Sequence, residues 1–171
     1  MRLQGNGRLG RMLVPLFLWQ ADLIRTPTFY VSSFLEAHRE TYYDHLLTVS
    51  RDNDWSGWCA FFLQAIIEQA TENSDKASRI LKLYNEKKTE MVDLTHSQYS
   101  LPALDWIFER PIFSSSDFVE NAGIPAPTAR RILSVFRETG LLTILVAPSG
   151  RRAGVYAFAA LLNIAEGHDA F

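Results

Sequence analysis

Residues 126–146 read APTARRILSVFRETGLLTILV, and this stretch decides the fold of the carboxy-terminal part of the chain. Apolar residues recur at helical spacing between residues 128 and 139, which predicts a helix with one buried face. Gly140 stops that helix, because glycine readily adopts the left-handed conformation that ends a helix. The apolar and β-branched residues 141–146 then predict a strand.

The neighbouring residues extend this pattern in both directions. PSGRRAG at 148–154 predicts the turn of a hairpin, with residues 155–158 as its return strand. The expected order is a helix at 101–108, an extended piece at 112–113, a helix capped by Ser115 or Ser116 that runs to Asn121, a tight turn at 124–127, the helix at 128–139, the hairpin, and a last helix at 159–166. This order is typical of a winged helix-turn-helix domain.

Such a domain binds DNA when its second helix enters the major groove and its hairpin, the wing, contacts the backbone. From residue 97 onward, however, six arginines stand against seven acidic residues, a net charge of −1. Because DNA-binding domains are usually basic, a role in dimerisation or protein docking stays open beside DNA binding. The residues expected to face DNA are Thr128, Arg130, Arg131 and Ser134 on the helix, and Arg151 and Arg152 at the tip of the wing.

The amino-terminal part of the chain predicts only helices. The first of them carries apolar side chains on most sides and is expected to be largely buried, with a bend at Pro15. Asp54 is expected to cap the third helix, and the turn-forming residues 73–75 predict a break after it. The expected helices span 7–25, 30–50, 55–73 and 76–94. The predicted fold class is mainly α, with one domain at 1–96 and a second at 97–171.

Composition places the chain among ordinary globular proteins. It has 171 residues, of which 47% are hydrophobic, and a net charge of −2, so no overall field favours a nucleic acid or a membrane surface. The single cysteine, Cys59, excludes an internal disulfide and is expected to be a buried, inert thiol. We expect no secretory signal, and the apolar run 12–19 is too short to span a membrane. We expect a cytoplasmic protein without a membrane partner.

A second informative stretch, Gly5-Asn6-Gly7-Arg8-Leu9-Gly10-Arg11, lies at the start of the first helix. Glycines allow backbone N–H groups to converge on an oxygen, and a helix start adds unpaired donors and a positive dipole end. Two arginines three residues apart point to the same side of a helix. Together these features predict a phosphate-binding turn.

This stretch resembles the second half of the motif H-P-F-x-[D/E]-G-N-G-R-x-x-R of the Fic family, whose members transfer AMP from ATP to hydroxyl groups of target proteins. The similarity continues through FYVSSFLEAHRETYYDHL at 29–46, DWSGW at 54–58 and FFL at 61–63. It extends to FERP at 108–111 and PTARR at 127–131, within the winged helix that many of these proteins carry. The resemblance covers nearly the whole chain and implies a partial Fic-type helical bundle followed by a winged helix-turn-helix domain.

The resemblance also implies a site. Gly5, Asn6 and Gly7 would form the anion hole for the ATP phosphates. Arg8 and Arg11 would hold the phosphates, with Arg11 on the γ-phosphate. ATP and Mg²⁺ are the cofactors of the family, and a target protein is its partner.

Two departures from the family pattern bear on activity. The motif histidine, the general base, would fall one residue before Met1, and none of the four histidines of this chain takes its place. Gln4 stands where the family has the acid that holds Mg²⁺, and a neutral amide carbonyl is a poorer ligand for this cation. We therefore expect no AMP transfer by this chain alone. It would keep a phosphate-binding loop and a winged-helix module for binding or regulation.

Two other interpretations stay open: a fragment of an active Fic protein adenylyltransferase whose histidine-bearing half is missing, and a DNA-binding transcriptional regulator. Without the first helices of the family, the apolar faces of 9–23 and 58–67 would be exposed, so we expect self-association, as a homodimer or a larger assembly. The string SDFVEN at 116–121 also fits the family's inhibitory-helix pattern, but Phe118 and Val119 favour a core helix of the winged domain.

Overall fold

The computed structural model describes residues 6–26, 30–150 and 152–169, and for residues 6–9 the description is limited to their helical backbone. The chain divides into two compact units, Met1–Ser74 and Asp75–Phe171. Helices make up 71% of the protein, and a small three-stranded sheet lies in the second unit. The mainly α fold class predicted from the sequence is confirmed.

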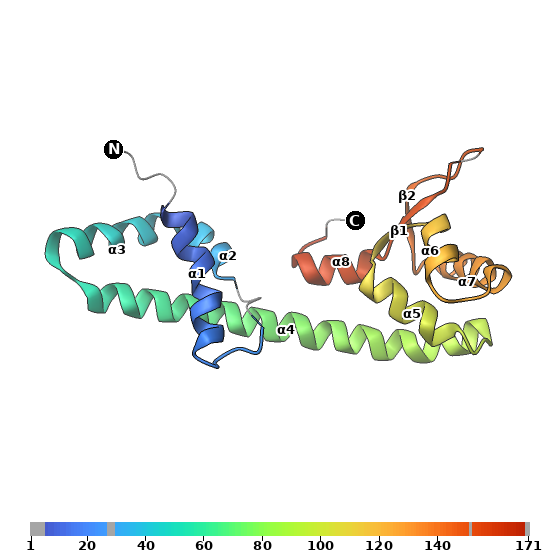
Figure 1. Cartoon of the computed structure of the whole chain (residues 1–171), viewed down its shortest axis with the longest axis horizontal. Coiled ribbons are helices and arrows are strands. Elements are labelled where there is room, and N and C mark those ends of the chain that lie inside the picture. Colours follow the sequence, from blue (N-terminus) through green and yellow to red (C-terminus); the bar gives the residue numbers. More distant parts are fainter. Residues whose placement is uncertain (1–5, 27–29, 151, 170–171) are drawn as a thin grey trace. The chain divides into compact units, whose positions relative to one another are not determined.

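The first unit is built from helices (Figure 1). They are α1 (Asn6–Gln20), α2 (Ser32–Ala37), α3 (Arg39–Asp52) and the first part of α4 (Trp55–Thr95). The first helix ends at Gln20 instead of residue 25, and the chain turns at Asp22, which has a positive φ of 56°. Asp54 caps α4 as predicted, because its Oδ1 accepts the backbone N–H of Gly57 at 2.9 Å.

The single helix expected at 30–50 was wrong, since two helices meet at His38. The backbone of His38 departs from helical geometry, with φ −110° and ψ 38°. Its ring stacks on Phe34 with the centroids 4.1 Å apart, and its Nδ1 lies 3.0 Å from the Phe34 carbonyl oxygen. The backbone N–H of His38 donates to the same carbonyl oxygen at 2.9 Å, so the break lies in the backbone torsion angles of His38 and not in a lost helical hydrogen bond.

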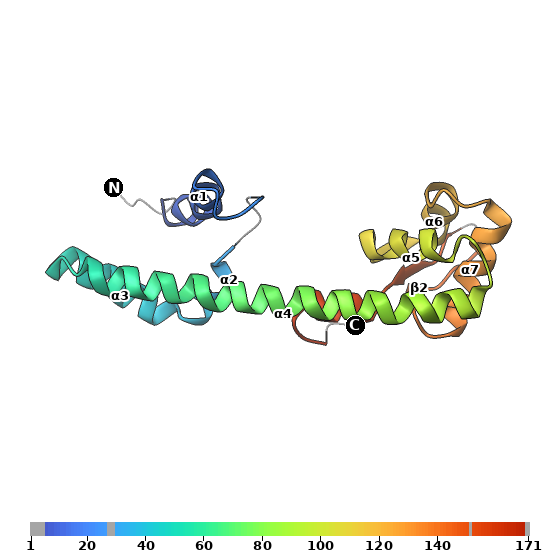
Figure 2. The same cartoon turned by 90° about the horizontal axis from the view of Figure 1, so that it is seen from below.

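The break expected at 73–75 was also wrong, because α4 runs without interruption from Trp55 to Thr95 (Figure 2). The side chain of Asn73 accepts a hydrogen bond from Gln69 Nε2 at 3.2 Å. Gln69 is buried, and its Oε1 accepts a hydrogen bond from Ser33 of α2 at 2.5 Å. The amide of Asn73 is therefore engaged by the preceding turn of its own helix and does not fold back on the backbone to end it.

The expected burial of α1 was wrong as well. Pro15 is buried, whereas Phe17 is 63% and Met12 65% exposed. Cys59 on α4, expected to be buried, is exposed. The periodicity of a helix identifies its apolar residues, but burial depends on how much protein packs around it. The exposed large apolar residues of α1 and the turn after it are Met12, Leu13, Leu16, Phe17, Trp19 and Leu23. Self-association through such a face stays a prediction.

The second unit begins in α4 and contains all the strands. Its further elements are α5 (Ser100–Glu109), β1 (Ile112–Ser114), α6 (Ser115–Asn121), α7 (Ala126–Glu138), β2 (Thr143–Val146), β3 (Val155–Ala157) and α8 (Ala159–Glu166). Each lies within two residues of its predicted bounds. The N-cap of α6 is Ser114 rather than Ser115 or Ser116, because the Ser114 hydroxyl accepts the backbone N–H of Asp117 at 3.1 Å.

The sheet has the strand order β1-β3-β2, with both pairs antiparallel. Tyr156 at the centre of β3 is paired with Phe113 of β1 on one side and Ile144 of β2 on the other. The strands β2 and β3 form a hairpin that follows α7 in the chain (Figure 1). The tip of this hairpin contains an isolated bridge between Ser149 and Arg152.

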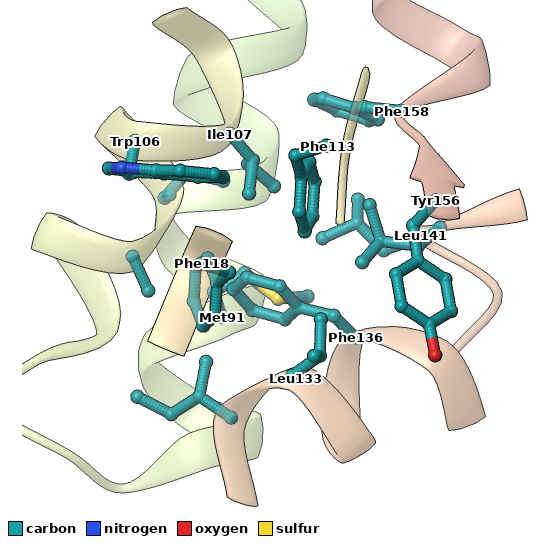
Figure 3. Close-up of a cluster of buried hydrophobic side chains, with 14 of the residues drawn as sticks. Met91, Trp106, Ile107, Phe113, Phe118, Leu133, Phe136, Leu141, Tyr156 and Phe158 are labelled. Atoms are coloured by element: carbon teal, nitrogen blue, oxygen red, sulfur yellow. The ribbon is translucent and has the colours of Figure 1, made fainter. Parts of the chain in front are cut away.

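An aromatic cluster forms the core of the second unit (Figure 3). The edge of Trp106 meets Phe113 and Phe118 at centroid distances of 4.9 and 5.2 Å. Phe136 of α7 and Met91 of α4 are completely buried in the same cluster. The carboxy-terminal part of α4 is thus a core element of the second unit. This explains why the division between the units falls at Ser74 and Asp75, within α4, rather than after residue 96.

Tyr84 joins α4 to α5 by donating a hydrogen bond to Asp105 Oδ1 at 2.6 Å. This hydrogen bond, together with partial burial and the negative charge of Asp105, raises the pKa of Tyr84 above its ordinary value. Because its pKa is higher in the folded state, the protonated Tyr84 hydroxyl stabilises the folded protein. This contribution is fully present below the unfolded pKa of about 10 and is lost as the pH rises through the folded pKa.

We therefore predict that, above about pH 10, the melting temperature of the wild type falls more steeply with pH than that of Tyr84→Phe. Thermal denaturation followed by circular dichroism from neutral to alkaline pH measures this difference. Parallel curves for the two proteins would contradict it.

The continuity of α4 makes a second prediction. Proline at position 75 would remove a helical hydrogen bond and clash with the preceding turn, so Asp75→Pro should destabilise the protein by about 3 kcal/mol or more. Asp75→Ala is the matched control and should be neutral or slightly stabilising, because alanine favours helices. Chemical denaturation measures the free energy of unfolding of both variants. A proline variant as stable as the alanine variant would indicate a loop at this position.

Candidate nucleic-acid interface

A groove of about 420 Å³ lies among α6, α7 and the hairpin β2–β3, and we call it the α7 groove. Arg130, Ser134 and Arg137 stand four and three residues apart on α7, so they share one flank of that helix. The groove is lined by these three residues, by Ser116 and Glu120 of α6, and by Pro148 and Tyr156 of the hairpin. The structure therefore brings together two of the predicted DNA-facing residues, Arg130 and Ser134, with a third polar residue, Arg137.

The other two predicted residues of α7 do not line this groove. Arg131 donates a hydrogen bond from Nη1 to the backbone carbonyl oxygen of Thr95 at 2.9 Å. It thereby satisfies a carbonyl at the end of α4, where the last helical carbonyls have no partner within the helix. Thr128 lies three residues before Arg131, on the same flank of α7, and is half-buried. The role of Arg131 depends on a residue 36 positions away, which no local pattern indicates.

Arg137 is the residue of the α7 groove that the sequence analysis did not select. The spacing along the helix could have identified it. Arg137 stands seven residues after Arg130, which is two helical turns along the same flank. The guanidinium carbon of Arg137 lies 5.8 Å from the centroid of the Tyr156 ring, a cation–π geometry. Arg137 thus contacts β3 and still borders the groove.

The charge within the α7 groove is mixed. Arg130 and Arg137 supply two positive charges, and Glu120 supplies one negative charge. Glu138 is engaged by Ser134, whose hydroxyl donates to its Oε1 at 2.9 Å. The two guanidinium groups are donors suited to phosphate oxygens, so the groove has the chemistry to contact a nucleic-acid backbone.

The predicted wing residues are only partly described. Arg152 is exposed on the hairpin, where its backbone pairs with Ser149. Arg151 lies outside the described residues. The hairpin therefore presents at least one arginine in the second unit, and the DNA contact proposed for Arg151 stays a prediction.

Tyr156 links α7 to the hairpin. Its side chain is only 2% exposed, and its ring lies at the edge of the aromatic cluster with the hydroxyl turned away from it (Figure 3). A Cβ placed on Gly154 would lie 2.7 Å from Tyr156 Oη and 3.1 Å from Pro148 Cδ. Glycine is therefore needed at position 154 for the tyrosine hydroxyl to fit beneath the hairpin.

The predicted phosphate-binding turn is described only in part. Gly5 and Gln4 lie outside the described residues. Asn6, Gly7 and Arg8 form the first turn of α1, so Asn6 and Gly7 are helical, but their side chains are not described. Arg11 is half-buried and borders a cavity of the first unit together with Gly10. The assignment of ATP phosphates to Gly5, Asn6, Gly7, Arg8 and Arg11 stays a prediction.

The described residues also bear on metal binding and on membrane insertion. They contain no group of three or more histidine, cysteine, aspartate or glutamate side chains that could hold a metal ion. Within the same ranges, none of the helices combines the length and apolarity that crossing a bilayer requires. Phe118, in the string SDFVEN, is fully buried, and Glu120 borders the α7 groove. This placement agrees with the interpretation of that string as a core helix.

A comparison of the sequence with known protein families gives no match.

The contact of Gly154 with Tyr156 gives a prediction. Gly154→Ala should destabilise the protein by about 1–3 kcal/mol, because the added methyl group meets atoms that are already packed. Adding Tyr156→Phe should recover part of the loss, since it removes the closest atom. Gly10→Ala is the control, because a Cβ there meets nothing within 4 Å. The stability of all three variants is compared with that of the wild type through their melting temperatures. A Gly154→Ala protein as stable as the wild type would contradict this packing.

Proposed function

We propose that the second unit is a winged helix-turn-helix domain that binds DNA through the α7 groove. The order helix, strand, helix, helix and hairpin supports the domain type, as does the pairing of β1 with β3. In this arrangement α7 is the recognition helix and the hairpin is the wing. Under this proposal the second unit has a winged helix-turn-helix fold and its partner is DNA.

One observation carries the proposal: Arg130, Ser134 and Arg137 line a single groove beside the hairpin. A duplex seated on α7 would meet both guanidinium groups and the hydroxyl from the same direction. Arg130 lies nearer the start of α7, where recognition helices contact base edges, and Arg137 lies farther along, where a backbone phosphate fits better. Arg131 lies outside the groove and donates one hydrogen bond to the carbonyl oxygen of Thr95, so the proposal gives it no contact within the groove.

Protein docking is the second candidate for this unit. Ile112, Ile144 and Leu145 of the sheet are each more than 40% exposed, which suits an apolar partner better than a nucleic acid. The two arginines of the α7 groove favour DNA instead, because a protein interface core is depleted of charge. The experiment below separates the two candidates.

For the first unit we propose, from the resemblance to the Fic family, a part of a Fic-type bundle that does not transfer AMP by itself. The residues Gly5 to Arg11 support this proposal through their agreement with the family motif. The half-buried side chain of Arg11 also supports an anion site. The ATP phosphates are one class of anion for Arg11, and the next subsection includes ATP among its probes.

The DNA-binding proposal predicts that Arg130→Ala and Arg137→Ala each weaken the binding of random-sequence duplex DNA, by about fivefold to a hundredfold. Each variant that loses a phosphate contact should also lower the slope of log affinity against log salt by about one. Fluorescence anisotropy with a labelled duplex, at several salt concentrations from about 50 to 200 mM, measures both quantities.

Arg79→Ala is the matched control, since it removes one exposed arginine of the second unit that does not line the groove. It should leave affinity and slope unchanged apart from a small effect of net charge. The proposal fails if the wild type does not bind duplex at low salt, or if the two groove variants behave like Arg79→Ala. Absence of binding at low salt would leave protein docking as the better account.

A further inference from the structure

We propose that the first unit contains a binding site for an amphipathic organic anion, a molecule with one negatively charged group on an apolar body. Arg11 would hold the charged group, and aromatic and aliphatic side chains of α1, α2, α3 and α4 would enclose the body. This site is independent of DNA binding. It lies in a different unit, and its residues do not take part in the α7 groove.

The site is a cavity of about 380 Å³ in the first unit. Small-molecule pockets of proteins occupy about 300–1,000 Å³, so the cavity lies at the lower end of that range. Val14 comes from α1, Tyr42 and Leu46 from α3, and Trp58 and Phe62 from α4. Together with Leu35 of α2, these residues come from four helices that converge on one apolar space.

Aromatic rings form one wall of this cavity. Trp58 lies 5.6 Å from Tyr42 and 5.8 Å from Phe62, measured between ring centroids. All three side chains are half-buried, so each has a part of its surface that its neighbours do not cover. Such a wall favours an alkyl chain or an aromatic ring, because both lose contact with water on entering.

Arg11 supplies the charge. It is half-buried and borders the cavity, and it has no ion pair or hydrogen bond with any other described residue. A guanidinium stays charged at all physiological pH values and has five donors. Partial burial of an unpaired charge is unfavourable, and an anionic group at this position would compensate it.

Arg11 borders open space. The cavity lies beside it, and Gly10, which has no side chain, lines the same cavity. Arg11 also borders a second cavity of about 240 Å³, together with Met12, Tyr30 and Ser32. A charged group can therefore approach the guanidinium without displacing a described side chain.

One cation in an otherwise apolar cavity favours a ligand with a single negative charge. A carboxylate or sulfonate carries one charge, which a single guanidinium can pair in bidentate geometry. A triphosphate brings several charges, and the other described residues of this cavity offer no second cation to receive them. The described residues therefore favour a monoanion with an apolar body over a nucleotide.

The experiment uses the whole chain and the fluorescent probe 1-anilinonaphthalene-8-sulfonate, an aromatic monoanion. We expect this probe to bind the wild type at one site per chain and decanoate to displace it. Decanol, which has a similar chain but no charge, should displace it at least tenfold less effectively, because it cannot make the charge-assisted bond. ATP should displace it less effectively than decanoate.

Arg11→Gln should weaken decanoate binding about tenfold or more and leave the binding of decanol unchanged. Arg11→Lys should recover part of the affinity, since it restores the charge without the bidentate geometry. Arg25→Gln is the matched control, because Arg25 is an exposed arginine of the same unit that does not border the cavity. It should bind both compounds like the wild type. Circular dichroism and thermal denaturation show whether each variant is folded.

Several outcomes would overturn the proposal. These are failure of the wild type to bind the probe, equal affinity for decanoate and decanol, or equal decanoate affinity in Arg11→Gln and Arg25→Gln. Displacement by ATP but not by decanoate, abolished in Arg11→Gln, would show that Arg11 serves a nucleotide phosphate instead. The DNA affinity of Arg11→Gln should equal that of the wild type, so failure at this site and failure of the α7 groove are distinguishable.

Discussion

Burial of one face of α7 against the aromatic cluster is the constraint on which the candidate interface depends. Ala129, Ile132 and Phe136 are completely buried, and they fix the rotation of α7 about its axis. With that rotation set, Arg130, Ser134 and Arg137 fall on one flank and Arg131 on another. The flank with two arginines borders the hairpin, and Tyr156 holds the hairpin in place from the same core. Packing energy in the second unit thus determines the direction in which its polar groups point.

In the first unit, by contrast, the apolar side chains are incompletely covered. Apolar side chains surround much of α1, and the described residues cover only some of them. Met12 and Phe17 are exposed, whereas Pro15 is buried and Val14 is half-buried. The resulting unit is open, and its aromatic side chains border a cavity where a closed core would have filled it. Arg11, which is half-buried, borders that cavity.

The two units also differ in how well their elements could be predicted. In the second unit several local signals coincide at each boundary: Gly123 and Gly140 adopt positive φ where α6 and α7 end, and Ser114 caps α6. In the first unit the signals conflicted with interactions that are distant or specific to one side chain. The backbone of His38 departs from helical geometry in a stretch whose neighbours favour a helix, and Gln69 engages Asn73 so that a turn-forming residue continues one. Burial of α1 and of Cys59 could not be deduced from periodicity, because it depends on neighbouring elements.

For the candidate sites, the sequence selected Arg130, Ser134 and Arg11, but it did not assign them neighbours. The pairing of Arg131 with Thr95, the association of Arg137 with Tyr156, and the aromatic wall near Arg11 all join residues that are far apart in the chain.

The sequence by itself determined the secondary structure of the second unit and the mainly helical character of the whole, because helix caps, glycine stops and apolar periodicity act over a few residues. Only the tertiary structure decided which arginines share a groove, which one is engaged in capping a helix, and which apolar faces are covered. Those outcomes depend on contacts between distant segments, whose energies no short window of sequence contains.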